Sequence, residues 1–198
     1  MSHNEQHLLE RSKAGDAAAF EELIEAYQKK IFNLAYRIVG NYDDAADLAQ
    51  EAMIRIFRSI ANFREQSSFS TWVYRITTNV CLDEIRRKKN TRVLSLDEEI
   101  HVEDGEVKRQ IMSDEPQPDE VAEREELRSL IDSAIKSLPE DQRLVLTLRD
   151  LQGLSYEEIS KILDCPVGTV KSRINRARQA LKNVLYDKRE LLSEDYVK

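Results

Sequence analysis

The side chains best suited to chemistry lie in one stretch near the carboxyl end of the chain, KSRINRAR at 171–178. Arginine and lysine bind phosphates, and serine, asparagine and arginine hydrogen-bond to base edges in DNA. Between Val167 and Val184 the sequence has five positive charges and no negative one. The same composition is typical of an ordinary solvated basic helix. Whether this stretch binds DNA therefore depends on the elements that would position it.

The elements around this stretch predict a helix-turn-helix. Pro139 opens a helix that Gly153 ends. Ser155 and Glu158 then form a capping-box pattern before SYEEISKIL. A turn at 164–166 and a helix from Val167 follow. In such motifs the second helix enters the major groove, and this context favours DNA reading over a merely solvated face.

The predicted second helix has two opposite faces at 100° per residue. The apolar stripe, which must pack inward, is Val167, Val170, Ile174, Ala177 and Leu181. The polar stripe is Ser172, Asn175, Arg176 and Gln179, flanked by Lys171, Arg178 and Lys182, with Arg173 nearer the core. The polar stripe would read bases, and the flanking cations would neutralise phosphates.

The sequence of the N-terminal region predicts three or four helices. Approximate bounds can be assigned to three of them, at about 17–39, 43–60 and 68–89. In the last of these, the predicted inward face is Phe69, Trp72, Val73, Ile76 and Val80. A lateral strip carries Thr71, Arg75, Thr78, Asn79 and Arg86. Aromatic, hydroxyl, amide and cationic groups suit single-stranded DNA, although aromatic residues at helical spacing also occur simply as core.

The helix at about 43–60 predicts a different surface. Its inward face is Ala49, Met53, Ile56, Phe57 and Ile60. Its outward face is Asp44, Asp47, Glu51 and Arg55, with Leu48 among them. An acidic patch around an exposed apolar residue suits a basic protein partner, and an ordinary solvated face explains it equally well.

Charge is unevenly distributed along the 198 residues. The net charge is −7, but residues 93–126 hold thirteen acidic and three basic groups, whereas the flanking regions are slightly basic. A basic cluster, RRKKNTR, occupies 86–92. We therefore predict an all-α protein with two small helical domains, at 7–92 and 127–186, joined by a flexible acidic linker at 93–126.

Several classes are disfavoured by the sequence. The two cysteines and three histidines have no metal-ligand spacing, and no phosphate loop or nucleophile–base pattern occurs. We expect no metal, no cofactor and no small-molecule substrate, and we expect that the protein is not an enzyme. No signal peptide or long apolar run is present, which predicts a cytoplasmic location.

Three motifs resemble one family. NYDDAADLAQEAMIRIF, FSTWVYRITTNVCLDEIRRKK and LPEDQRLVLTLRDLQGLSYEEISKILDCPVGTVKSRINRARQAL occur in the order found in extracytoplasmic-function (ECF) sigma factors, the sigma-E and sigma-W groups in particular. The resemblance spans about Leu8 to Leu185. It implies a sigma region 2 at 7–92, which binds polymerase and the −10 element, and a sigma region 4 at 127–186, which reads the −35 element.

The resemblance also implies roles for individual residues. The implied −35 contacts are Arg149, Lys171, Ser172, Arg173, Asn175, Arg176 and Arg178. The implied −10 contacts are Asn62, Phe63, Ser68, Trp72, Arg75, Asn79 and Arg86, the loop 62–68 capturing a flipped base. The implied polymerase contacts are Asp47, Leu48, Gln50, Glu51 and Phe57. Sigma-E proteins carry an aromatic residue where this chain has Asn175.

The implied partners are core RNA polymerase, through the β′ clamp helices and the β flap, promoter DNA, and a membrane-anchored anti-sigma factor that restrains the protein in an envelope stress response. The linker would follow the path later taken by nascent RNA. The alternative is an autonomous, dimeric helix-turn-helix regulator. That alternative leaves the N-terminal domain and the acidic surface without a role, and the acidic total charge argues against strong independent DNA binding.

Overall fold

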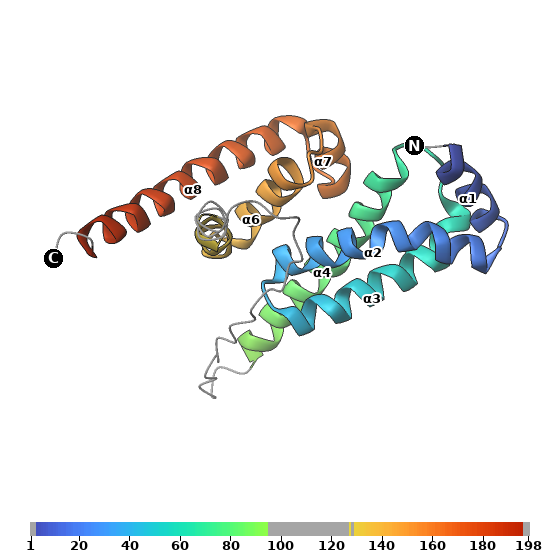
Figure 1. Ribbon diagram of the computed structural model, residues 1–198, viewed down its shortest axis with the longest axis horizontal. Helices are drawn as coiled ribbons and strands as arrows, with labels where there is room; N and C mark the ends of the chain where they lie inside the picture. The colour runs from blue at the N-terminus through green and yellow to red at the C-terminus, as the bar shows by residue number, and fades with distance from the viewer. Residues whose placement is uncertain (1–2, 95–126, 128, 196–198) are drawn as a thin grey trace, which may run out of the picture.

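The computed structural model describes residues 3–94, 127 and 129–195, and all regular elements in these residues are helical (Figure 1). The N-terminal elements are α1 (His3–Lys13), α2 (Ala17–Val39), α3 (Tyr42–Ser59), the 3-10 turn η1 (Ile60–Asn62) and α4 (Phe69–Leu94). The C-terminal elements are α6 (Glu140–Leu146), the π-helical segment η2 (Thr147–Leu151), α7 (Tyr156–Leu163) and α8 (Val167–Asp195). Residues 129–136 are also helical. The all-α prediction is confirmed for the described part of the chain.

Local capping explains why the N-terminal helices begin and end where they do. The Asp16 carboxylate accepts a hydrogen bond from the Ala19 amide at 3.1 Å, which caps the start of α2. Gly40 ends α2 in the left-handed conformation, at φ 81°, which glycine adopts without steric cost. Asn41 then caps α3 by accepting from the amide of Asp44 at 3.1 Å. The sequence-predicted bounds of 17–39 match α2.

The N-terminal bundle, α1 to α4, has a core of its own. Its buried members come from all four helices and from the segment that follows α3: Leu8, Leu9, Ala19, Phe20, Leu23, Ile24, Tyr27, Ile31, Ala49, Ala52, Ile56, Ile60, Phe63, Phe69, Val73 and Val80. Lys13 pairs with Glu65 at 2.9 Å and so ties α1 to the loop that precedes α4. This loop includes most of the segment predicted to capture a promoter base.

The C-terminal helices share their core with the bundle. The apolar cluster that holds Val145, Ile159 and Ile174 together also contains residues of α2, α3 and α4: Leu34, Ala35, Ile38, Ala45, Tyr74 and Cys81. Helix α7 packs on α4, and α6 packs on α2. Figure 1 shows α6 and α7 beside the bundle, with α8 running away from it toward the C-terminus. The sequence did not predict how the two regions lie relative to each other. In this structure they pack directly against each other.

The sequence also predicted an acidic linker and the absence of a long apolar run. The predicted acidic linker, 93–126, lies outside the described residues except for 93 and 94, which belong to α4. Across the described helices, none combines the length and the apolar character that crossing a membrane requires. Both cysteines are free thiols, and burial raises the pKa of Cys81 to about 12.

Candidate nucleic-acid interface

The helix-turn-helix forms as the sequence predicted. Ser155 accepts from the Glu158 amide at 3.2 Å, and the Glu158 carboxylate accepts from the Ser155 amide at 2.8 Å, which completes the capping box. Asp164 ends α7 in the left-handed conformation, and the hydroxyl of Ser160 donates to the carbonyl of Cys165 at 2.6 Å. These bonds fix the direction in which α8 leaves the turn.

The predicted reading face of α8 is exposed. Lys171, Ser172, Asn175 and Arg176 all face solvent, while Val170, Ile174 and Ala177 are buried against α6 and α7. Val167 was predicted to pack inward and is instead 38% exposed, because it lies in the first turn of α8, beside the connecting turn. The exposed set supplies amide, hydroxyl and guanidinium groups within two helical turns, as base reading requires.

Two of the remaining predicted −35 residues, Arg149 and Arg178, are held by internal contacts. Arg149 donates to the carbonyl of Leu154 at 2.6 Å and lies over the ring of Tyr156 at 4.9 Å. Arg178 forms a two-point ion pair with Asp150, with N–O distances of 3.1 and 2.5 Å, and this pairing raises its pKa. Arg173 is half-buried. Arg149 and Arg178 therefore brace the segment η2 in this conformation.

The loop 62–68 joins the bundle through one aromatic anchor. Asn62 is exposed, but Phe63 is 5% exposed and its ring lies 5.0 Å from that of Trp72 and 5.7 Å from that of Phe69. Ser68 accepts a hydrogen bond from the amide of Thr71 at 3.1 Å and so caps α4. Phe63 thus supports the loop from within the core rather than presenting its ring to solvent, and Trp72 is half-buried beside it.

The lateral strip of α4 is only partly open. Arg75, Asn79 and Arg86 are exposed, as the strip prediction requires. Thr71 and Thr78 were predicted on the same strip, but they are 2% and 0% exposed. Thr71 is covered because its hydroxyl donates to the carboxylate of Glu158 in α7 at 2.6 Å.

Within the basic cluster at 86–92, the three described side chains, Arg86, Arg87 and Lys88, all lie beside carboxylates. Arg86 lies 3.3 Å from Asp83, Arg87 pairs with Glu84 at 2.7 Å, and Lys88 pairs with Asp44 of α3 at 2.5 Å. These contacts lower the pKa of Glu84 and raise that of Arg87. Nearby carboxylates thus offset part of the positive field that the sequence suggested.

The predicted polymerase surface lies along α3. Asp47 and Gln50 are exposed, whereas Leu48 is half-buried between the two apolar clusters and Glu51 pairs with Arg55 at 2.7 Å. Phe57 was predicted to face inward, and that orientation is wrong: its ring is 52% exposed, with one edge against Phe20 at 4.9 Å. An exposed phenyl ring is a better protein contact than a buried one.

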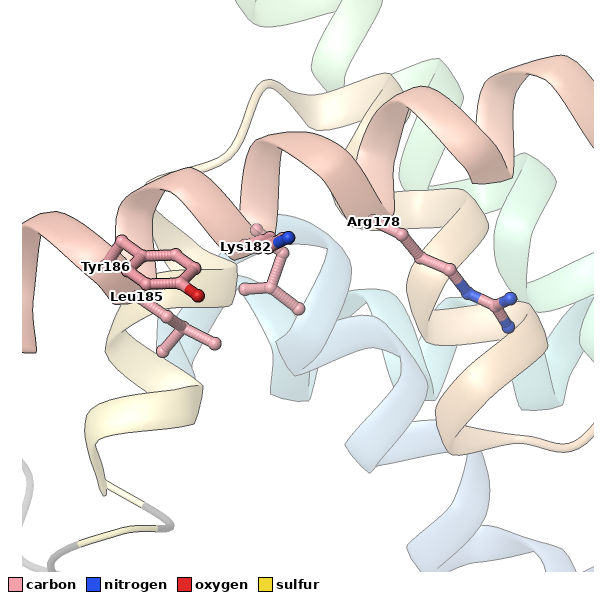
Figure 2. A pocket seen from close by; sticks show the side chains of 5 residues that line it. Arg178, Lys182, Leu185 and Tyr186 are labelled. Carbon is pink, nitrogen blue, oxygen red and sulfur yellow. The ribbon is translucent and has the colours of Figure 1, made fainter.

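A separate apolar groove runs along α8 beyond the reading face (Figure 2). Its lining residues are Arg178, Leu181, Lys182, Leu185 and Tyr186. A single helix supplies all of them, so the groove is an open face.

Within residues 3–94 and 129–195, no group of three or more His, Cys, Asp and Glu side chains is placed to hold a metal ion.

Comparison with known proteins identifies the family. Residues 23–91 match the model of Sigma-70 region 2, and residues 128–181 match that of Sigma-70, region 4. The ECF RNA polymerase sigma-E factor of Escherichia coli is 43% identical over 183 residues, which is 90% of this chain and 93% of that protein. The chain belongs to the ECF sigma factors. The RNA polymerase sigma-H factor of Pseudomonas aeruginosa is 41% identical over 185 residues, covering 91% and 93% of the two chains.

One solved structure supports the arrangement of the helices. The sigma factor RpoE of Bartonella quintana, solved with the anti-sigma factor NepR, aligns with a TM-score of 0.67 at 23% identity, covering 84% of this chain and 96% of that one. At this identity the match concerns the fold alone. This ECF sigma factor therefore has the helical architecture that the sequence predicted.

Sequence reasoning missed the contacts that join the two regions of this ECF sigma factor. Glu158 was recognised as a capping residue, but its second partner, Thr71, is 87 positions away. Tyr156, which stacks on Arg149, was also missed. The threonines on the strip of α4 could have indicated these contacts. A hydroxyl group that becomes buried needs a hydrogen-bond partner, and another element of the fold can supply it.

Proposed function

We propose that this chain directs core RNA polymerase to promoters by reading the −35 element with α8 and capturing the unpaired −10 strand with α4 and the loop before it. The observation that carries the −35 assignment is the exposed face of Lys171, Ser172, Asn175 and Arg176 on a capped helix-turn-helix. These side chains lie on the outer side of α8, opposite the buried Val170 and Ile174. Membership of the ECF sigma factors supports the assignment of this face to promoter DNA.

We assign the −10 contact to two exposed groups of residues. One is the loop, through Asn62 and Ser68, and the other is the open part of the strip, Arg75, Asn79 and Arg86, beside Trp72. Amide and hydroxyl groups can hydrogen-bond a flipped base, and the guanidinium groups neutralise its backbone. Phe63 acts as the anchor that holds the loop in place.

We assign the contact with the β′ clamp helices to α3. Asp47, Gln50 and Glu51 present polar and acidic groups, and Phe57 presents an exposed ring at the far end of the same helix. Acidic residues around an exposed ring complement a basic partner surface, because rim charges steer association and the ring supplies apolar contact area. Leu48 is half-buried and stabilises α3 on the bundle.

We further propose domain limits of 7–92 and 127–186, a cytoplasmic site of action, and restraint by a membrane-anchored anti-sigma factor in an envelope stress response. The matches to regions 2 and 4 lie within the proposed limits. The Bartonella quintana protein was solved with an anti-sigma factor, which supports a partner of the same kind here.

The test is run-off transcription with purified core polymerase and a library of promoter fragments. Sequence-selective initiation that needs both components is expected. Arg176→Ala should reduce promoter-directed transcripts by roughly 10–100-fold, since one good base contact contributes about 1–3 kcal/mol, and it should leave polymerase binding intact. Lys29→Ala, an exposed cation on α2, is the matched control and should change neither.

The polymerase surface has its own pair of variants. Asp47→Lys with Glu51→Lys should weaken polymerase binding, whereas Glu21→Lys with Glu22→Lys, on the exposed side of α2, should not. If the chain alone binds a specific duplex tightly and has no effect on core polymerase, it is an autonomous regulator and the proposal fails.

A further inference from the structure

The loop 62–68 is anchored near both of its ends. Phe63 is buried in the core of the bundle, with 5% of its surface exposed. At the other end, the Ser68 hydroxyl accepts a hydrogen bond from the amide of Thr71 at 3.1 Å. Between these anchors, residues 64–66 are all exposed. The conformation of this exposed part therefore depends on contacts other than the two anchors.

The backbone of Glu65 adopts an unfavourable conformation in the middle of the loop. Its φ angle is 56°, in the left-handed region, where the Cβ of an L-residue comes too close to the following carbonyl oxygen. Among the described residues, only Glu65 and Asp164 have a positive φ without being glycine. Aspartate has a short polar side chain that tolerates this region, whereas glutamate does not belong to the tolerant residues. Such a conformation persists only where the surrounding structure holds it.

The contact that holds Glu65 comes from the first helix. The ammonium group of Lys13, the last residue of α1, lies 2.9 Å from Oε1 of Glu65. This hydrogen bond lowers the pKa of Glu65 and raises that of Lys13, so both groups are charged at neutral pH. A longer contact of Lys13 with Glu10, at 3.4 Å, stays within α1. Since Leu8 and Leu9 anchor α1 in the core of the bundle, Lys13 gives the loop a fixed point of attachment.

The ion pair and the strained backbone are comparable in energy. An exposed ion pair contributes about as much as a left-handed residue other than glycine costs, within a small factor. A further contact with the loop, from Lys161 to the carbonyl of Gln66, is longer, at 3.4 Å. The observed loop conformation is therefore populated largely because Lys13 pairs with Glu65. A ligand that needs this conformation binds with an affinity reduced by the fraction of chains that lack it.

We infer that Lys13 is a positioning residue for the proposed capture of an unpaired −10 base, because its ion pair with Glu65 holds the loop 62–68 in the conformation that receives the base. This inference rests on the proposed function, in which Asn62 and Ser68 supply the contacts with the base. Glu65 acts through its backbone conformation and not through a contact with DNA. The pair also offsets the negative charge of Glu65, which would otherwise repel the phosphates of the captured strand.

The first test removes the ammonium group. The reconstituted polymerase holoenzyme is titrated with a promoter fragment selected in the run-off experiment, whose non-template strand is unpaired across the −10 element, and fluorescence anisotropy gives the Kd. Lys13→Ala should weaken binding by about two- to five-fold, as expected for an ion pair of this exposure. Arg11→Ala is the matched control, because it removes one positive charge from the same helix and Arg11 pairs with Asp16 rather than with the loop. Equal losses in the two variants would show that only net charge matters, and would overturn the inference.

Two substitutions at position 65 separate backbone conformation from charge. Glu65→Ala and Glu65→Gly remove the same carboxylate and leave the same net charge, but only glycine adopts the left-handed conformation without steric cost. The chain with Glu65→Gly should therefore bind the unpaired fragment about three- to ten-fold more tightly than the chain with Glu65→Ala. Equal affinities would mean that the conformation of residue 65 does not limit base capture, which contradicts the inference.

A double-mutant cycle asks whether Lys13 acts through Glu65. In the chain with Glu65→Gly, adding Lys13→Ala should change the Kd by less than about 1.5-fold, because the residue that Lys13 positions no longer needs it. The charge-swapped chain, Lys13→Glu with Glu65→Lys, should bind more tightly than the chain with Lys13→Glu alone. A Lys13→Ala effect of undiminished size beside Glu65→Gly would mean that Lys13 contacts DNA directly, and the inference would be wrong.

The controls distinguish failure of this inference from failure of the proposed function. A duplex fragment that ends upstream of the −10 element should be bound equally by all variants, and circular dichroism should show equal helix content. If the unchanged holoenzyme binds the unpaired fragment no better than an unrelated single strand of the same length, the proposed −10 function fails. If it binds selectively and the variants of Lys13 and Glu65 do not differ from it, this inference alone fails.

Discussion

The N-terminal bundle and the C-terminal helix-turn-helix are stabilised in different ways. The bundle buries its own cluster around Ile31 and Phe69, built from α1 to α4 and the segment after α3. The cluster around Ile174 instead includes Leu34 and Tyr74 from the bundle. Domains of about 60 residues bury a smaller share of their surface than larger ones and are correspondingly marginal. The base-reading region thus gains stability from its neighbour.

The largest expected effects come from truncating each core. Ile31→Ala and Ile174→Ala each remove a fully buried side chain and should lower local stability by about 2–5 kcal/mol. Trp72 is the only tryptophan and lies in the bundle, so its fluorescence reports on the bundle, whereas circular dichroism reports on all helices. In urea titrations, Ile31→Ala should move both midpoints. Ile174→Ala should move the circular dichroism transition and leave the fluorescence midpoint nearly unchanged.

Equal displacement of both midpoints by Ile174→Ala would contradict separate stabilisation of the two regions, because it would show that they unfold as one cooperative unit. Leu9→Ala is a suitable companion to Ile31→Ala, since it also removes a fully buried side chain of the bundle.

Removal of a helix cap should cause a loss of stability of intermediate size. Ser155→Ala removes the cap of α7, and Asn41→Ala removes that of α3. Each should lower stability by about 0.5–2 kcal/mol. The effect of Ser155→Ala should appear in circular dichroism alone, whereas that of Asn41→Ala should also appear in Trp72 fluorescence. A fluorescence shift from Ser155→Ala as large as that from Asn41→Ala would contradict the independence of the bundle.

The smallest expected effect concerns pH and the contact between the regions. The hydrogen bond from Thr71, together with bonds from Ser155, lowers the pKa of Glu158 below its ordinary value. A lowered folded-state pKa stabilises the fold above the unfolded-state pKa, near 4.3, and this stabilisation is lost as the pH falls through the folded-state value. Since Glu158 is only half-buried and lies near solvent, we expect a contribution of about 0.3–1 kcal/mol.

The variant for this test is Glu158→Gln, which keeps the shape of the side chain and can still complete a capping box. Its thermal midpoint should lie below that of the unchanged chain at pH 7, and the difference should disappear as the pH approaches 3.5. A difference that persists at low pH would mean that the loss arises from packing rather than from the carboxylate.

Local signals made much of the fold predictable. The bounds of α2 follow from Asp16 and Gly40, and the capping box of α7 follows from Ser155 and Glu158. Helix α1 received no predicted bounds, because its short sequence buries only Leu8, Leu9 and Ser12. Helical periodicity identifies a face but not the neighbour that will cover it. That limitation explains the inward predictions for Phe57 and Val167, which the structure shows to be exposed.

The candidate site was predictable where it depends on one helix and unpredictable where it depends on two. The exposure of Ser172, Asn175 and Arg176 follows from the periodicity of α8 alone. The burial of Thr71 and Thr78 arises from the contact of α4 with the C-terminal helices, which leaves no periodic trace in the sequence. The Arg178–Asp150 pair likewise joins residues 28 positions apart.

The π-helical segment η2 has a consequence for how this region can change in evolution. A π turn accommodates one more residue than an α turn while the helix axis continues, so it is where a single insertion or deletion disturbs the surrounding helices least. Loss of one residue from 147–151 would convert the π turn into an ordinary α turn while α6 keeps its direction. Length variants of one residue at this segment would therefore leave both the direction of α8 and its reading face largely unchanged.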